Sequence, residues 1–314
     1  MSEILKSKDL KNFYKDGFLI LPNFYNVKEE ILEIKRSIYD IIGIVANKYK
    51  IKLGRSQFNP KKFDEGILKI LAVNRIYISE IYDAVKQITP FIRLVSSKKN
   101  QEVYKYISEY KKKEVFDSAL SVNNRKKERR TERVREKSKF NLKKNAFNKV
   151  LDGIAGQGFG IRMNIPGEKK FLANWHQDYS SQLRSLNGVV FWSPLVEMNN
   201  TLGPVKILVG SHREGLLPVY SDNSAYGLVI QNEKKIIKKH QIISPLTKPG
   251  DLILMDYLTV HSSGKNLSNN ILWSMQFRFF DYLEPSGILH GWKGNSLNNI
   301  NFKNIHPKMI KNEN

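Results

Sequence analysis

Apolar and polar positions divide the chain into a front part with helical spacing and a back part built of short strands. Residues 1–95 are predicted to be mostly helical. One face of a helix is marked by apolar residues three or four apart, at Ile31, Ile34, Ile38 and Ile41. Residues 67–95 keep an apolar period and are predicted to be helical as far as Pro90. The apolar run at 18–21, between a glycine and a proline, predicts a strand.

The back part, residues 149–285, shows short apolar runs separated by turn sequences. The runs lie at 159–165, 187–193, 205–209, 226–230, 241–244, 252–256 and 271–280. Pro-Gly, Gly-Pro and Asn-rich turns separate them. Strands at this spacing are typical of an antiparallel sandwich or barrel. The pattern predicts a mainly β core with flanking helices, followed by a C-terminal extension at 286–314.

A basic insertion, residues 96–148, lies between the two parts. Its segment 125–137 has few apolar residues and many Lys and Arg residues. Glutamates spaced by four and interleaved with arginines are compatible with a solvated helix, and a mobile loop is the alternative. We interpret the insertion as a solvated segment. The alternative hypothesis is that it forms an arm that binds anionic ligands.

Composition limits the kind of protein. The length of 314 residues allows one large domain or two small ones, and we expect a single domain over 1–314. No apolar run reaches eighteen residues and the N-terminus lacks a signal-peptide pattern, so we expect no membrane span and a cytoplasmic location. Cysteine is absent, which excludes disulfides and thiolate metal sites. Any metal must be held by His, Asp, Glu or backbone oxygen, a set that suits Fe(II) or Mn(II) better than structural zinc.

The formal net charge of +22 favours anionic partners. The alternative explanation for the positive charge is an AT-rich genome, which enriches Lys together with Asn and Ile. The basic segment lacks the interleaved aromatic residues that single-strand binders use for stacking, so nucleic acid is an unexpected partner. The sequence does not indicate an oligomeric state.

The candidate chemistry lies in Trp175-His176-Gln177-Asp178 and in the distant His261. If His176 and Asp178 lie on a strand, their side chains share a face because they are two residues apart. His261 follows a turn and an apolar strand, and would complete a set of two histidines and one carboxylate. Such a set covers one side of Fe(II) and leaves positions for a co-substrate and O2. The other histidines are interpreted as hydrogen-bonded structural residues.

The order of these motifs resembles the phytanoyl-CoA dioxygenase family of Fe(II)/2-oxoglutarate oxygenases. The resemblance covers about residues 150–295, and residues 13–23 show a weaker similarity. It rests on the segments 162–167, 175–178, 187–195, 203–213, 249–251 and 261–266, which read RMNIPG, WHQD, NGVVFWSPL, GPVKILVGSHR, PGD and HSSGKN.

The resemblance implies a double-stranded β-helix, a cupin-like jelly-roll barrel. It also implies Fe(II) held by His176, Asp178 and His261, with 2-oxoglutarate as co-substrate. The expected reaction is O2-dependent hydroxylation of a small molecule. The charge of the basic insertion, rather than the resemblance, suggests the hypothesis that this molecule is anionic or bound to a carrier. Gln177, Trp192 and Ser263 are expected to line the co-substrate pocket, with Tyr179 and Arg184 on a substrate-facing loop.

One position departs from the family pattern. The arginine that grips 2-oxoglutarate usually follows the distal histidine by about eleven residues, and Leu272 stands there. The nearest arginine, Arg278, shares a strand face with Leu272 but lies about 20 Å away at roughly 3.3 Å per residue, so it can substitute only on a bulged strand.

Three alternatives stay open for the distal carboxylate of 2-oxoglutarate. Arg162 binds it from another strand, or polar groups of Gln177, Ser263 and Ser274 hold it. In the third, binding is weakened or lost, because a buried carboxylate facing leucine costs several kcal/mol. That outcome would leave a jelly-roll metal- or ligand-binding protein without turnover. A nucleic-acid-directed oxygenase is a more remote alternative.

Overall fold

The front part of the chain is a helical layer that also contributes one strand. The structure, a computed structural model, describes residues 4–127, 149–156, 158–221, 228–294 and 302–311. The elements of this part are α1 (Ser7–Asp16), β1 (Phe18–Leu21), η1 (Val27–Ile31), α2 (Leu32–Lys48), α3 (Ile67–Val73), α4 (Arg75–Val85), α5 (Thr89–Val95) and α6 (Lys98–Lys127). The predicted strand at 18–21 is confirmed, and α2 buries Ile34, Ile38 and Ile42 along one face.

The prediction that helix continues as far as Pro90 was wrong in its boundaries. The Asn74 side chain accepts a hydrogen bond from the Ile76 N–H and begins α4, which ends at Val85. Pro90 lies in the first turn of α5. The proline nitrogen has no hydrogen to donate there, but the first-turn N–H groups of a helix have no intrahelical acceptor either. Pro90 therefore begins a helix in this chain.

The back part supplies the remaining strands, joined by short helices. The strands are β2 (Asp152–Ile154), β3 (Gly160–Asn164), β4 (Val189–Pro194), β5 (Lys206–Leu208), β6 (Val219–Ser221), β7 (Leu228–Ile230), β8 (Ile242–Ile243), β9 (Leu252–Asp256), β10 (His261–Ser262) and β11 (Leu272–Asp281). The short helices are α8 (Tyr179–Gln182), η2 (Ser211–Glu214), α9 (Glu233–Lys239), α10 (Pro285–His290), α11 (Phe302–Ile305) and η3 (Pro307–Met309). Each of the seven apolar runs predicted as strands overlaps one of these strands.

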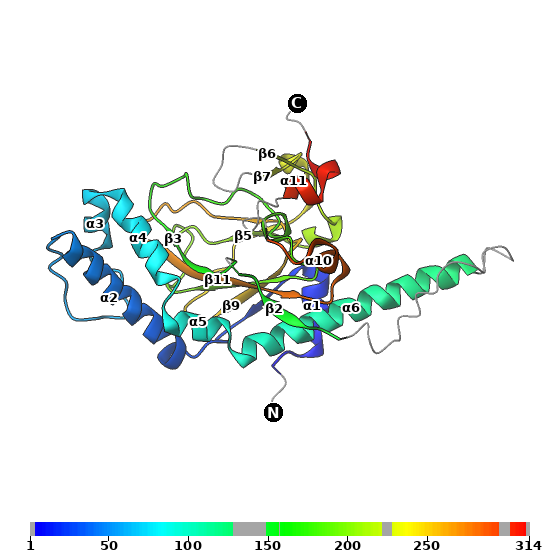
Figure 1. Ribbon diagram of the computed structural model, residues 1–314, viewed down its shortest axis with the longest axis horizontal. Coiled ribbons are helices and arrows are strands. Elements are labelled where there is room, and N and C mark those ends of the chain that lie inside the picture. Colours follow the sequence, from blue (N-terminus) through cyan, green and yellow to red (C-terminus); the bar gives the residue numbers. More distant parts are fainter. Residues whose placement is uncertain (1–3, 128–148, 157, 222–227, 295–301, 312–314) are drawn as a thin grey trace.

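The strands form antiparallel sheets, as predicted. A six-stranded sheet has the order β1-β9-β4-β11-β2, with β3 also paired to β11. A second sheet has the order β10-β5-β8, and β6 pairs with β7. Figure 1 shows helices α2 to α5 gathered at one side of the large sheet, with β5 on its other side. The coarse prediction of β-sheets with flanking helices is therefore confirmed.

Alternate side chains of the large sheet enter two different cores. On β4, Val189 and Phe191 pack in the cluster that contains the isoleucines of α2. Val190 and Trp192 pack in a second cluster, together with Ile207 of the smaller sheet. This period of two is the ordinary alternation of a strand buried on both faces. The face that points away from the helices is therefore available to line an interior site.

Helix α6 belongs to the basic insertion, and ion pairs attach it to the large sheet. Lys105 Nζ lies 2.9 Å from Asp152 Oδ1, and Lys111 and Lys112 pair with Asp256 and Asp281 of the large sheet. These lysines attach the helix to the ends of three strands, so part of the excess positive charge is structural. Residues 128–148 of the insertion lie outside the described residues, and the choice between helix and loop is untested there. None of the helices in the described part of the chain is long and apolar enough to cross a membrane.

Candidate metal centre

His176 and His261 lie opposite each other on two antiparallel segments. The N–H of His176 donates to the carbonyl of His261 at 3.0 Å, and the N–H of His261 donates back at 3.1 Å. In each ring Nδ1 faces the carbonyl oxygen two residues earlier, that of Asn174 at 2.7 Å and of Thr259 at 3.0 Å. A carbonyl only accepts, so both Nδ1 atoms carry hydrogen and the lone pair is on Nε2. This is the tautomer that binds a metal through Nε2.

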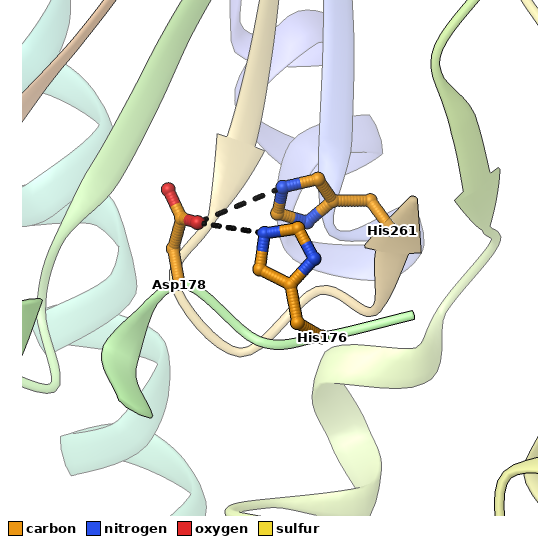
Figure 2. A group of neighbouring side chains, drawn as sticks. All are labelled: His176, Asp178 and His261. Carbon is orange, nitrogen blue, oxygen red and sulfur yellow. Dashed lines mark ion pairs between the residues drawn. The ribbon is translucent and has the colours of Figure 1, made fainter. Parts of the chain in front are cut away.

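Asp178 completes the group, and its backbone lies at the start of a helix rather than on a strand. Its Oδ1 lies 3.2 Å from His176 Nε2 and 3.7 Å from His261 Nε2 (Figure 2). The expectation that His176 and Asp178 lie on one strand was wrong. His176 forms an isolated bridge and Asp178 is the N-cap residue of α8, with φ −62° and ψ −29°. The turn into α8, rather than strand alternation, brings this carboxylate to the imidazoles.

The three side chains are buried and their ionisation suits a cation. Burial favours the neutral form of Asp178, but the Arg278 guanidinium and the two histidines outweigh it and hold the pKa of Asp178 well below its usual range. Burial, reinforced by His176, lowers the pKa of His261 to about 4. Asp178 is therefore ionised and His261 neutral near pH 7, as metal ligation requires.

The donor set fits the metal expected from the sequence. The ligand atoms of His176, Asp178 and His261 lie within 4.8 Å of one another, and all three residues are buried. Two imidazole nitrogens and one carboxylate oxygen, converging from one side, make the set used by non-haem Fe(II). The structure thus brings together the three residues singled out from the sequence.

A cavity opens beside the two histidines. Of the residues predicted for the co-substrate, Arg162, Trp192, Ser263 and Arg278 line it, as do Leu272 and Ser274. Gln177 is not among the lining residues found in the described part of the chain. Its amide nitrogen donates to the carbonyls of Gly215 and Leu258, both at 2.8 Å, and its oxygen accepts from the Leu217 N–H at 2.9 Å. Gln177 thus joins the loops behind the two ligands.

Leu272 and Arg278 lie on the same face of β11, and both reach the cavity. The pairing of β11 with β3 and β4 runs in unbroken register from Leu272 to Phe279. A bulge that would bring Arg278 to the place of Leu272 is therefore absent between these two residues. Instead, Arg278 Nε donates to Asp178 Oδ2 at 2.6 Å. The Arg278 side chain thus lies at the metal end of the cavity.

Arg162 is half-buried on β3, directly across from Ser274 of β11. Its neighbour on the same face of β3, Asn164, pairs with Leu272, so Arg162 lies two residue pairs along the ladder from the position where the family arginine is expected. Ser263 exchanges hydrogen bonds with the backbone of Ala173, at 3.1 Å through its hydroxyl and at 3.0 Å through its N–H. The cavity is therefore lined by Arg162 from β3, beside the Leu272 end of β11, as well as by Arg278 from β11 itself.

The substrate-facing loop expected at Tyr179 and Arg184 is placed differently. Tyr179 is buried, with its hydroxyl 3.0 Å from His306 Nε2. Arg184 is also buried and donates to the carbonyls of Gln182 and Gly156. Neither residue is among the cavity-lining residues of the described chain. Tyr179 in α8 and Arg184 just after it therefore face away from this cavity, in contrast to the expectation.

Gln276 is the residue of the polar face of β11 that the sequence did not single out. Positions 272, 274, 276 and 278 read Leu, Ser, Gln and Arg, and all four line the cavity. The intervening residues Trp273, Met275 and Phe277 are fully buried against the helices. An alternation of polar and large apolar residues in a strand predicted to be buried was the available signal of a polar interior cavity.

Comparisons with known proteins agree with this arrangement. The model of the phytanoyl-CoA dioxygenase (PhyH) family matches residues 13–271. No curated protein sequence matches the chain.

Solved structures are similar in fold. EctD from S. alaskensis with bound Fe is 13% identical, with a TM-score of 0.52 over 89% of this chain and 78% of that chain. The same protein with 2-oxoglutarate and 5-hydroxyectoine has a TM-score of 0.51, at 13% identity, over 89% of this chain and 77% of that chain. The epimerase SnoN, in complex with Fe3+, alpha ketoglutarate and nogalamycin RO, has a TM-score of 0.50 at 13% identity, over 90% and 88%.

Proposed function

Because the chain belongs to the phytanoyl-CoA dioxygenase family, we propose that it is an Fe(II)- and 2-oxoglutarate-dependent oxygenase. The observation that carries the proposal is the buried set of His176, Asp178 and His261 beside a cavity with cationic lining residues. Bound iron, with 2-oxoglutarate and O2, supplies the oxidising chemistry of such enzymes. The chain supplies the ligands, the orientation of the co-substrate and the exclusion of water.

The proposal includes the finer architecture. The six-stranded sheet and the sheet β10-β5-β8 form the two layers of a double-stranded β-helix. Side chains from both layers, among them Trp192, Ile253 and Ile207, share one apolar cluster. The His176–His261 bridge extends the smaller sheet at the metal centre. In this arrangement the ligands lie at one mouth of a barrel whose interior is the described cavity.

Within this cavity we assign the distal carboxylate of 2-oxoglutarate to Arg162. Arg162 lines the cavity near Leu272, where its Nη2 donates a long hydrogen bond of 3.4 Å to the Phe171 carbonyl, whereas Arg278 Nε donates to Asp178 Oδ2 at 2.6 Å. Ser263 and Ser274 offer hydroxyl groups to the same co-substrate, and Trp192 forms an apolar wall. A guanidinium pairs with a carboxylate through two parallel N–H donors, which fixes orientation as well as charge.

The proposed substrate is a small molecule, and hydroxylation is the proposed reaction. An anionic or carrier-bound substrate is supported by the charge of the chain and by the basic insertion. Deletion of residues 123–144 is expected to raise the KM for such a substrate and to reduce its salt dependence. Unchanged kinetics would remove the anionic substrate from the proposal without affecting the metal centre.

One observation favours a second candidate, a metal- and ligand-binding protein without turnover. Leu272 lines the cavity where the family pattern places an arginine. The two candidates differ in a product. The Fe(II)-loaded protein, incubated in air with 2-oxoglutarate, ascorbate as reductant and a cell extract as the source of substrate, is expected to release succinate above the extract alone, and Asp178→Asn is expected to abolish this release. Metal and 2-oxoglutarate binding without any succinate would favour the second candidate.

A further inference from the structure

We propose that Arg278 is a positioning residue that makes Asp178 a one-oxygen ligand. The two oxygens of the Asp178 carboxylate have different partners. Oδ1 faces both histidine Nε2 atoms, at 3.2 and 3.7 Å, whereas Oδ2 accepts a 2.6 Å hydrogen bond from Arg278 Nε. Oδ1 thus faces the side on which the histidines would hold a metal, and Oδ2 is engaged by Arg278. The inference rests on the proposed function, since it concerns how this metal centre is prepared for its co-substrate.

The Arg278 guanidinium is itself fixed in place. Its Nη1 donates to the carbonyl of Gly158 at 2.9 Å and its Nη2 donates to Gln276 Oε1 at 3.3 Å. The side chain is 9% exposed, and its strand β11 lies between β4 and the pair β2 and β3 in the large sheet. The contact with Asp178 is therefore part of the rigid sheet, and rotation of the carboxylate would break a charge-assisted hydrogen bond in a buried place.

This restraint matters because carboxylates bind metals through one oxygen or through two. Two imidazoles and one carboxylate oxygen would leave positions on a bound Fe(II) for a chelating 2-oxo acid and for O2. If Asp178 bound through both oxygens, it would occupy a further position and compete with the co-substrate. By holding Oδ2, Arg278 would keep that position open.

The requirement is for an arginine rather than for a positive charge alone. The planar guanidinium can satisfy Asp178, Gly158 and Gln276 at once from one fixed orientation. A lysine ammonium carries the charge without that fork. Arg278→Lys is therefore expected to recover part of the function that Arg278→Gln loses.

The alternative role for Arg278 is a direct grip on the distal carboxylate of 2-oxoglutarate. Oxalate separates the two roles, because it chelates a metal through adjacent carboxylates and has no distal group. The experiment measures binding of 2-oxoglutarate and of oxalate to the Co(II)-loaded full-length chain by calorimetry without O2. The variants are Arg278→Gln, Arg278→Lys and, as the matched control on the same cavity, Arg162→Gln.

If Arg278 acts through Asp178, Arg278→Gln weakens both chelators by a similar factor of about tenfold or more, equivalent to about 1.4 kcal/mol. Arg278→Lys lies between this variant and the wild type, and the visible spectrum of bound Co(II) changes in Arg278→Gln because its coordination changes. Arg162→Gln weakens 2-oxoglutarate alone and leaves the Co(II) spectrum of the protein without chelator unchanged.

Three results overturn the inference. Weakening of 2-oxoglutarate alone in Arg278→Gln would show a direct grip, and unchanged binding of both chelators would show that Arg278 is dispensable. In either case the proposed function stands, because the wild type binds metal and 2-oxoglutarate. Failure of the wild type to bind Co(II) or 2-oxoglutarate would instead remove the proposed function, and the inference with it. Where Arg278→Gln does not fold, Arg278→Lys with oxalate and the Co(II) spectrum decides the question.

Discussion

His176 and His261 are paired residue to residue, and their backbones exchange two hydrogen bonds of 3.0 and 3.1 Å. Their ring centroids lie 4.3 Å apart. Two ligands distant in sequence are thus held by the same backbone pairing that extends the smaller sheet. The distance between their Nε2 atoms depends on main-chain geometry rather than on surface side chains. A metal centre built this way is preorganised before any ion binds.

Removal of the Asp178 carboxylate is expected to destabilise the protein as well as to abolish metal binding. Asp178→Leu leaves the Arg278 guanidinium buried without its anionic partner, which costs about 3–5 kcal/mol. The double variant Asp178→Leu with Arg278→Met removes both charges and should recover a large part of that loss. Urea unfolding of the two variants and the wild type measures the free energies. A double variant no more stable than Asp178→Leu would show that the buried ion pair is not the cause.

The assignment of Arg162 can be tested by moving the positive charge along the cavity. Arg162→Gln is expected to weaken 2-oxoglutarate binding to the Mn(II)-loaded protein by about tenfold to a hundredfold, since charge-assisted hydrogen bonds are worth about 1.5–3 kcal/mol. Leu272→Arg in that background places a guanidinium two residue pairs away on the same face of the sheet and should restore binding. Calorimetry reports both changes. If the distal carboxylate binds elsewhere, Leu272→Arg will not restore binding. Leu272→Lys in the wild-type background is the control for a general effect of added positive charge on the Kd for 2-oxoglutarate.

Much of this fold could be predicted from alternation and turn residues, and the reason is local. Apolar runs bounded by turn residues located the strands that carry Trp192 and Arg278. The first is buried on both faces and reads as a continuous apolar run, whereas the second alternates large apolar residues with polar residues that line the cavity. The ligands His176, Asp178 and His261 were found by the order of motifs. The expectation that His176 and Asp178 converge because they share a strand was wrong, since the turn into α8 brings the carboxylate to the imidazoles.

The remaining features depend on tertiary contacts that no short pattern contains. The pairing of Arg278 with Asp178 joins β11 to the N-cap of α8 across 100 residues of sequence. Spacing along one strand could show only that Arg278 was too far from Leu272, not where its guanidinium would go. Similarly, Gln177 lies between the two ligands in sequence, but the loops at Gly215 and Leu258 take up its amide.

The loop that contains Glu168 and Phe171 borders the cavity and is attached to helix α4. Breaking this attachment is expected to weaken co-substrate binding. Arg75 makes two contacts with Glu168, at 2.5 and 3.1 Å, and its guanidinium lies 4.8 Å from the ring centroid of Phe171. Phe171 and the adjacent Leu172 line the cavity. Glu168→Gln should therefore raise the Kd for 2-oxoglutarate severalfold.

The stability cost of Glu168→Gln should remain within about 1 kcal/mol, because the ion pair is partly exposed. The matched control is Arg93→Met, which breaks the exposed pair between Arg93 and Glu33 on helices α5 and α2. This control should leave 2-oxoglutarate binding unchanged. Equal effects of the two variants on the Kd would argue against a role for the loop contact.

The stability of the helical layer is expected to depend on pH through Lys35. Burial lowers the pKa of Lys35 to about 8, against a smaller opposing effect of Asp64. Below pH 8 this lysine is charged in both the folded and the unfolded state, and the folded state carries the cost of burying the charge. Between pH 8 and the ordinary value of 10.5 the folded state releases the proton first, so this cost declines as the pH rises.

The comparison that isolates this effect is between the wild type and Lys35→Met. The stability of the wild type relative to Lys35→Met should rise from pH 7 to pH 10, as measured by unfolding in urea at each pH. Lys50→Met on the surface provides the control, and its difference from the wild type should stay constant. A Lys35→Met difference that is equally constant would mean that Lys35 keeps an ordinary pKa in the folded protein.

The most direct test of the central claim is an anaerobic titration of the Fe(II)-loaded protein with 2-oxoglutarate, followed by the visible charge-transfer absorption of the chelate. We expect a saturable band with one 2-oxoglutarate per protein in the wild type, and no band in Asp178→Asn or His261→Gln. The absence of any band at millimolar 2-oxoglutarate, in wild-type protein shown to hold Fe(II), would contradict the assignment of this chain as a 2-oxoglutarate-dependent oxygenase.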